Sequence, residues 1–172
     1  MRRRILLAAI GVGSLGVVAG CATGTPVDGA AVPARSATAG AGARWTANIR
    51  SVTQSRGEVM QTTRDRSYGS ATWERGESES VSNVNLVFTY SGQERFLAWA
   101  ILPGSCGTSS LPVLPIANFA EINVGGGGRG QVTTSLPLGL PVTGTYHIDI
   151  YRGRRQATDA LLACGTLMYA GG

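Results

Sequence analysis

The sequence predicts an all-β domain, a single Greek-key β-sandwich or barrel of about eight strands. Short apolar segments alternate with clusters of Gly, Ser, Asn and Pro, which is the spacing of strands and turns in such folds. Residues 81–90 alternate between apolar and polar side chains, as a half-buried strand does. Glycine occurs 25 times, and no long segment carries a convincing apolar stripe at helical spacing.

Eight segments carry the strand pattern, and turn residues separate them. In the third, apolar side chains at every second position share one face, which we expect to point into the core. The fourth segment, residues 96–102, is apolar on both faces, as in a strand covered from both sides. The three tryptophans are expected to be core anchors. The predicted strands are Trp45–Val52, Gly69–Glu74, Val81–Tyr90, Phe96–Leu102, Ile116–Val124, Gln131–Leu136, Thr145–Tyr151 and Ala160–Met168.

The N-terminus has the pattern of an export signal. Three arginines precede Ile5–Gly20, an uncharged run of 16 residues that is shorter than the roughly 20 residues a membrane span needs. The run ends in Val18-Ala19-Gly20-Cys21, which resembles the lipobox of bacterial lipoproteins. The resemblance implies cleavage after Gly20, diacylglycerol on the Cys21 sulfur and an acyl chain such as palmitate on the new amino group. An ordinary signal peptide and a retained membrane helix are the alternatives.

This interpretation divides the chain into three parts. Residues 1–20 form the lipoprotein signal peptide, residues 21–44 a lipid-anchored flexible tether, and residues 45–172 the β-sandwich domain. The tether consists mainly of Ala, Gly, Thr, Ser and Pro, which bury too little apolar surface to offset their ordering entropy. We expect a protein of the bacterial cell envelope, held on a membrane by its lipid. Because Ala22 follows the cysteine in place of aspartate, the resemblance implies the outer membrane, facing the periplasm, if the organism has two membranes.

Composition excludes several kinds of chemistry. All 15 basic residues are arginine, so no Schiff-base or phosphate-loop lysine exists, and the single histidine excludes a site of several imidazoles from one chain. The net charge of +5 owes much to the signal peptide: its removal leaves twelve arginines against ten acidic residues, a net charge of +2. Charge therefore gives no support to a nucleic-acid partner, and none is expected.

The three cysteines fit one lipid-anchored cysteine and one disulfide pair. If Cys21 carries lipid, Cys106 and Cys164 remain in an oxidising compartment, where a disulfide would close a loop of 58 positions. Chain-entropy reasoning gives that bond a stabilisation of about 4 kcal/mol. Two free buried thiols are the alternative. Neither cysteine belongs to a Cys-x-x-Cys motif, so redox catalysis is not expected.

The second half of the chain resembles a known family. Trp99–Gly107 ends in Gly-Ser-Cys-Gly, Gly144–Tyr151 includes a predicted strand, and Ala163–Leu167 contains Ala-Cys-Gly. In this order the three segments are similar to the closing half of Cu/Zn superoxide dismutase-like domains, and to the related chordin-type repeat domains of bacteria. The resemblance covers residues 96–168 and, more loosely, the strands from Trp45. It implies a dismutase-like sandwich in which Cys106 and Cys164 are the disulfide partners.

The copper-binding histidines of that family are absent. Dismutase-like members often read Trp-His-x-His before the first cysteine, and the corresponding residues here are Ala100 and Leu102. Another family histidine falls near Tyr151. Because redox copper needs several nitrogen ligands in fixed geometry, we expect no metal and no cofactor in this chain.

Other candidate residues have simpler interpretations. His147 and Asp149 share one face of a predicted strand, opposite three large apolar side chains, and are expected to form a solvated surface pair with Tyr151 near them. No Gly-x-Ser-x-Gly motif accompanies them, so no catalytic residue is assigned. The glycines of Gly125–Gly130 match a dinucleotide motif, but a strand follows in place of a helix, which favours a plain loop. Arg152–Arg155 is expected to be a solvated hairpin loop.

These observations favour a non-catalytic binding or structural module that a tether displays from a membrane. We expect its domain to be a metal-free relative of dismutase-like domains. Its expected partners are the membrane, through the lipid, and an envelope protein. An envelope metal-binding or superoxide-handling protein with a rebuilt site is one alternative function. A small-ligand carrier with a pocket inside the sandwich is another.

Overall fold

A computed structural model describes residues 40, 42–55, 58–61, 67–154 and 160–171 of the chain. The predicted signal peptide, Cys21, nearly all of the predicted tether and Arg155 lie outside the described residues. Among the helices of the described part, none has the length and apolarity that a membrane crossing requires.

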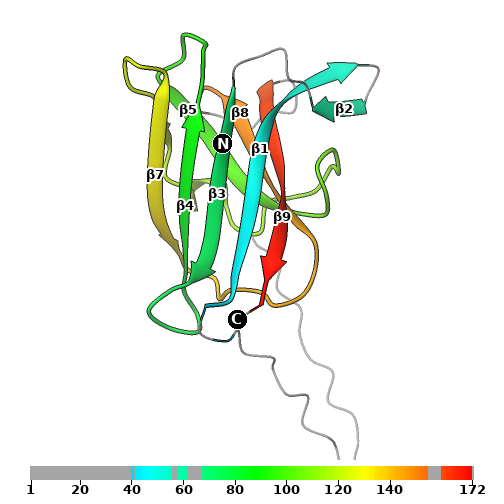
Figure 1. The fold of residues 1–172 in the computed structure, drawn as a ribbon, viewed down its shortest axis with the longest axis vertical. Coiled ribbons are helices and arrows are strands. Elements are labelled where there is room, and N and C mark those ends of the chain that lie inside the picture. The colour runs from blue at the N-terminus through cyan, green and yellow to red at the C-terminus, as the bar shows by residue number, and fades with distance from the viewer. Residues whose placement is uncertain (1–39, 41, 56–57, 62–66, 155–159, 172) are drawn as a thin grey trace, which may run out of the picture. The chain divides into compact units, whose positions relative to one another are not determined.

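The described part is an all-β fold, as predicted, with one short 3-10 turn, η1 (Ile116–Asn118). Figure 1 shows the strands wrapped into a nearly closed barrel. The strands are β1 (Arg44–Ser55), β2 (Glu58–Gln61), β3 (Tyr68–Arg75), β4 (Ser82–Thr89), β5 (Phe96–Pro103), β6 (Ile122–Asn123), β7 (Arg129–Leu136), β8 (Tyr146–Arg152) and β9 (Leu161–Ala170).

The strands follow the spatial order β6-β5-β8-β9-β1-β3-β4-β7, and every named pair is antiparallel. A bridge between Val124 and Gly130 joins the β6 end of this path to β7, so the sheet comes close to closing. Because β8 returns to lie beside β5 after β6 and β7, the order β8-β5-β6-β7 is a Greek key. The short β2 lies off the path and pairs only with the end of β1.

Seven of the eight predicted strands are confirmed, with ends that differ by at most three residues. The prediction for Ile116–Val124 is largely wrong, since only Ile122–Asn123 forms a strand and Ile116–Asn118 is a 3-10 turn. Phe119 and Ile122 are buried there because an irregular segment packs against the barrel. The sequence pattern did not predict β2.

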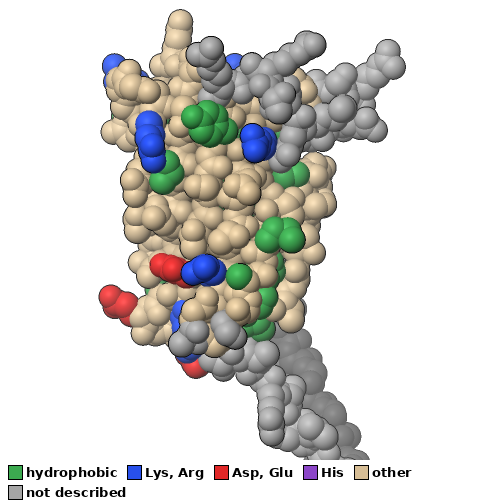
Figure 2. All heavy atoms as spheres, viewed as in Figure 1, with side chains coloured by type: hydrophobic (Ala, Val, Ile, Leu, Met, Phe, Trp, Pro, Cys, Tyr) green, Lys and Arg blue, Asp and Glu red, His purple; other side chains and the backbone are tan. Residues whose placement is uncertain are grey.

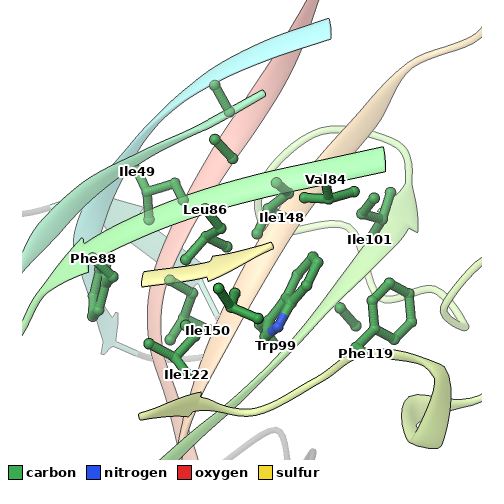
Figure 3. Packing of buried hydrophobic residues seen from close by; sticks show 14 of the residues in the cluster. Ile49, Val84, Leu86, Phe88, Trp99, Ile101, Phe119, Ile122, Ile148 and Ile150 are labelled. Carbon is green, nitrogen blue, oxygen red and sulfur yellow. The ribbon is translucent and has the colours of Figure 1, made fainter. Parts of the chain in front are cut away.

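The core lies inside the barrel and is built from the inward positions that strand periodicity predicted. Trp45, Trp73 and Trp99 are all buried, and Trp99 packs edge-on against Phe119 with ring centroids 5.0 Å apart. Figure 3 shows isoleucines of β8 and apolar side chains of β4 converging on the Trp99 ring from different strands. The indole N–H groups are also satisfied: Trp99 donates to Ala120 O at 2.6 Å and Trp73 to Ser82 Oγ at 2.7 Å.

The outward side of four neighbouring strands is polar and carries few charges, and we call it the polar face. Gln131 Nε2 donates to Asn85 Oδ1 at 3.4 Å, and Ser135 Oγ donates to Asn83 Oδ1 at 2.7 Å across β4 and β7. Figure 2 shows this side as a largely uncharged surface with scattered charged groups. The residues of the polar face are Thr46, Asn48, Ser70, Thr72, Asn83, Asn85, Gln131, Thr133 and Ser135.

Candidate functional site

The polar cluster on β8 is buried, which corrects the sequence prediction. His147 is 0% exposed, Tyr151 3% and Asp149 7%, whereas we expected a solvated surface pair. The prediction that they share one face of the strand is confirmed: the Tyr151 hydroxyl donates to Asp149 Oδ2 at 3.1 Å, and His147 Nε2 faces Asp149 Oδ1 at 3.7 Å. The prediction was wrong only in expecting solvent, and not other parts of the protein, on that face.

Register explains why a second buried layer forms outside the barrel wall. His147 lies opposite Leu102, Asp149 opposite Ala100 and Tyr151 opposite Ala98, all on β5. Directly opposed residues of antiparallel strands point to the same side of a sheet. Because β5 is apolar and buried on both faces, as its sequence predicted, the side chains beside it on β8 are covered as well.

The predicted disulfide between Cys106 and Cys164 is present. Cys164 lies on β9 directly opposite Asp149, and it is fully buried. Cys106 lies in the loop after β5 and is half-buried. The bond therefore holds this loop against β9, next to the polar cluster of β8.

The loop also fixes the histidine ring. His147 Nδ1 lies 2.9 Å from the carbonyl oxygen of Gly104, and the Gly104 N–H donates to Thr145 O at 2.8 Å. A carbonyl can only accept a hydrogen bond, so Nδ1 must carry the proton. In the neutral ring the lone pair is then on Nε2, which points toward Asp149.

One oxygen of the Asp149 carboxylate accepts a hydrogen bond, and the other has no partner among the described residues. Oδ2 accepts the hydrogen bond from Tyr151, whereas Oδ1 of Asp149 and Nε2 of His147 are buried and have no hydrogen-bond partner within the described part of the chain. Burial raises the pKa of Asp149, and the neighbouring His147 and the Tyr151 hydrogen bond oppose that rise. Two unpartnered buried polar atoms that face each other are an unusual arrangement, because each bears a desolvation penalty.

The residues present do not fit the copper site that the dismutase-like resemblance implies. Ala100 and Leu102 lie across from Asp149 and His147, and Tyr151 completes the same face, so the positions that the resemblance assigns to copper ligands lie at the polar cluster. None of those three side chains is an imidazole, and the chain has one histidine. A redox copper site with several nitrogen ligands therefore cannot be assembled from this chain.

The other motifs have structural roles. Gly125–Gly128 forms a turn, with Gly128 N donating to Gly125 O at 2.9 Å, and β7 follows it, so the dinucleotide interpretation lacks the helix it needs. This loop lines an open cavity of about 390 Å³ together with Thr89–Arg95. Arg154 of the basic loop pairs with Glu121 at 3.1 Å and lies over the Phe96 ring at 4.0 Å.

The sequence did not predict two side-chain interactions, one of His147 and one of Tyr90. The Gly104 carbonyl, 43 positions from His147, orients the imidazole, and no local pattern signals such a partner. Beside the glycine loop, Tyr90 donates a hydrogen bond to Glu94, four residues away. Burial and Glu94 raise the pKa of Tyr90 to about 12, and the Tyr90 hydroxyl lowers the pKa of Glu94.

Comparisons of the chain with protein-family models, with curated proteins and with solved structures found no match.

Proposed function

We propose that this protein is a non-catalytic binding or structural module of the bacterial cell envelope, held on a membrane by lipid on Cys21. The fold is a metal-free relative of dismutase-like domains, and the tether displays it to a partner in the envelope. The lipobox-like Val18–Cys21, the cysteine pair and the dismutase-like tracts around it support this proposal.

The observation that carries the proposal is the burial of the titratable cluster. A general acid, base or nucleophile must reach its substrate within hydrogen-bond distance. His147 is fully buried and Asp149 nearly so, and both lie beneath side chains and a loop held by a disulfide. A cluster enclosed in this way supports a structural role for these residues better than a catalytic one.

The polar face is the surface we propose for partner binding. It presents amide and hydroxyl groups that donate and accept hydrogen bonds, and three of its charged neighbours, Arg44, Glu74 and Arg129, lie toward the strand ends. Such a surface suits an uncharged polar partner better than a polyanion, which requires a dense basic patch.

The alternatives have unequal support. Among the described residues, His147 Nε2 and Asp149 Oδ1 have no hydrogen-bond partner, which favours a metal-binding function as the second candidate. A small-ligand carrier would need space inside the sandwich, but the described core is occupied by three tryptophans and many branched aliphatic side chains.

Site-specific photo-crosslinking in the native bacterium tests the proposal. A crosslinking residue at Thr133, in the polar face, should give a discrete adduct, and Asn85→Arg on the opposite strand should abolish it. The same residue at Ser109, an exposed loop position after β5, is the control and should give no such adduct.

Three results would overturn the proposal. They are equal labelling from both positions or from neither, superoxide dismutation by the purified oxidised protein, and one copper ion per oxidised chain. Cys21→Ser should release the protein from the membrane fraction, and unchanged membrane attachment would remove the lipid anchor from the proposal.

A further inference from the structure

We propose that His147, Asp149 and Cys164 form a latent zinc site that opens when the Cys106–Cys164 disulfide is reduced. The inference rests on the geometry of the β8–β9 cluster and is independent of what the polar face binds. In the oxidised protein the site lacks its thiolate, so reduction acts as the switch.

The three donor atoms are already gathered. His147 Nε2, a carboxylate oxygen of Asp149 and Cys164 Sγ lie within 4.8 Å of one another, and Nε2 is 3.7 Å from Oδ1. Two ligands about 2.1 Å from a tetrahedral zinc ion are about 3.4 Å apart. The pair therefore needs to close by only a few tenths of an ångström around an ion.

The outer partners of both ligands are those that zinc sites use. The Gly104 carbonyl accepts from Nδ1 and leaves the lone pair of His147 on Nε2. The Tyr151 hydroxyl donates to Oδ2 and leaves Oδ1 of Asp149 directed at the imidazole. Hydrogen bonds of this kind orient metal-binding imidazoles and carboxylates in advance.

The unpartnered atoms provide an independent indication. His147 Nε2 and Asp149 Oδ1 are both buried, and neither has a hydrogen-bond partner within the described ranges. One cation placed between the imidazole lone pair and the carboxylate oxygen satisfies both, which two unprotonated acceptors cannot do for each other.

The redox step supplies the remaining ligand. A dithiol reduces the disulfide by two electrons: the S–S bond breaks, Cys106 and Cys164 become thiols, and the dithiol becomes a disulfide. Zinc then displaces the thiol proton of Cys164 to solvent and binds the thiolate. Cys106 is the candidate fourth ligand, since its sulfur starts bonded to that of Cys164. Nitrogen, oxygen and sulfur donors together suit Zn²⁺.

Zinc titration of the full chain tests the proposal. All variants carry Cys21→Ser, so that Cys106 and Cys164 are the only cysteines. The reductant is a phosphine, because a small dithiol would itself chelate zinc. The reduced protein should bind one Zn²⁺ per chain at least a hundredfold more tightly than the oxidised protein, and Co²⁺ should give thiolate charge-transfer absorption.

Single variants distinguish this site from adventitious thiol binding. Cys106→Ser should bind zinc without any reductant, because Cys164 is then permanently a thiol, whereas Cys164→Ser should not. In the reduced state, His147→Ala and Asp149→Asn should each weaken binding by roughly a hundredfold, while Glu121→Gln, a half-buried acidic residue outside the cluster, should leave it unchanged.

Three outcomes would overturn the proposal. The first is equal zinc affinity in the oxidised and reduced proteins. The second is unchanged affinity in His147→Ala and Asp149→Asn, which would mean that the cysteines alone bind the ion. The third is loss of the folded near-ultraviolet dichroism in both the reduced protein and Cys106→Ser, since a latent site requires a folded reduced state.

Discussion

His147 and Asp149 face each other across 3.7 Å, from Nε2 to Oδ1, in a buried layer on the outer side of the barrel. Each has one partner that fixes its orientation, the Gly104 carbonyl for the imidazole and the Tyr151 hydroxyl for the carboxylate. The pair is thus held in place by a loop on one side and by its own strand on the other. Several consequences of this arrangement and of the barrel around it can be measured.

Loss of the disulfide should destabilise the oxidised fold strongly. The bond joins residues 58 positions apart, and chain-entropy reasoning gives a stabilisation of about 4 kcal/mol. The double variant Cys106→Ser/Cys164→Ser should lower the urea midpoint accordingly. The wild-type protein treated with a phosphine is the matched control and should unfold near the same midpoint. A midpoint equal to that of the oxidised wild type would contradict the prediction.

Tyr151→Phe should lower the free energy of unfolding by about 1–3 kcal/mol, because the variant removes a hydrogen bond to a buried carboxylate and leaves Oδ2 unpartnered. Tyr169→Phe is the control: this residue is 38% exposed and contacts Trp45 through its ring, which the substitution keeps. Chemical denaturation measures both variants. Equal, negligible effects would show that the Tyr151 hydrogen bond contributes nothing to stability.

Gly130→Ala should weaken the closure of the barrel. A Cβ at Gly130 would lie 2.5 Å from Ile122 Cγ2 and 2.8 Å from Asn123 O, so β6 would be pushed away from β7. We expect a loss of about 1–3 kcal/mol, as for overpacked cores. Gly126→Ala, where no atom lies within 4 Å of the added Cβ, should be close to neutral. Faster amide exchange in β6 and β7 of Gly130→Ala alone would locate the effect, and identical behaviour of the two variants would contradict it.

The Tyr90–Glu94 hydrogen bond should give the stability a defined pH dependence. The pKa of Glu94 is lowered from 4.5 in the folded state, so its contribution is present above pH 4.5 and lost as the pH falls through the lowered pKa. The pKa of Tyr90 is raised from 10.0 to about 12, so its contribution is present below pH 10 and lost as the pH rises toward 12.

Comparison with Tyr90→Phe isolates both effects. The stability difference between wild type and variant should be largest between about pH 5 and 9 and should shrink in acid and in alkali. Because Glu94 is partly solvated, its share should stay below about 1 kcal/mol. The absorbance of tyrosinate should show one tyrosine titrating near pH 12 in the wild type only. A pH-independent difference would rule out coupling between these groups.

Local pattern was enough to predict most of the barrel. Alternation over residues 81–90 places Val84, Leu86 and Phe88 in the core because the two faces of a strand are fixed by its period. The same argument predicted the tryptophan anchors, and counting the cysteines, on the expectation of an export signal, predicted the pairing of Cys106 with Cys164. The strand after the glycine loop could be predicted in the same way, since β-branched residues follow Gly130.

The tertiary structure decided what covers each face. Periodicity places His147 and Asp149 together on one side of β8, but it cannot say that β5 pairs beside them or that a loop held by Cys106 closes over them. Those contacts join residues some 40 to 60 positions apart, and they are set by strand order and register, which no local window contains. The sequence therefore determined most of the strands and their two faces, whereas long-range packing decided which polar side chains are enclosed.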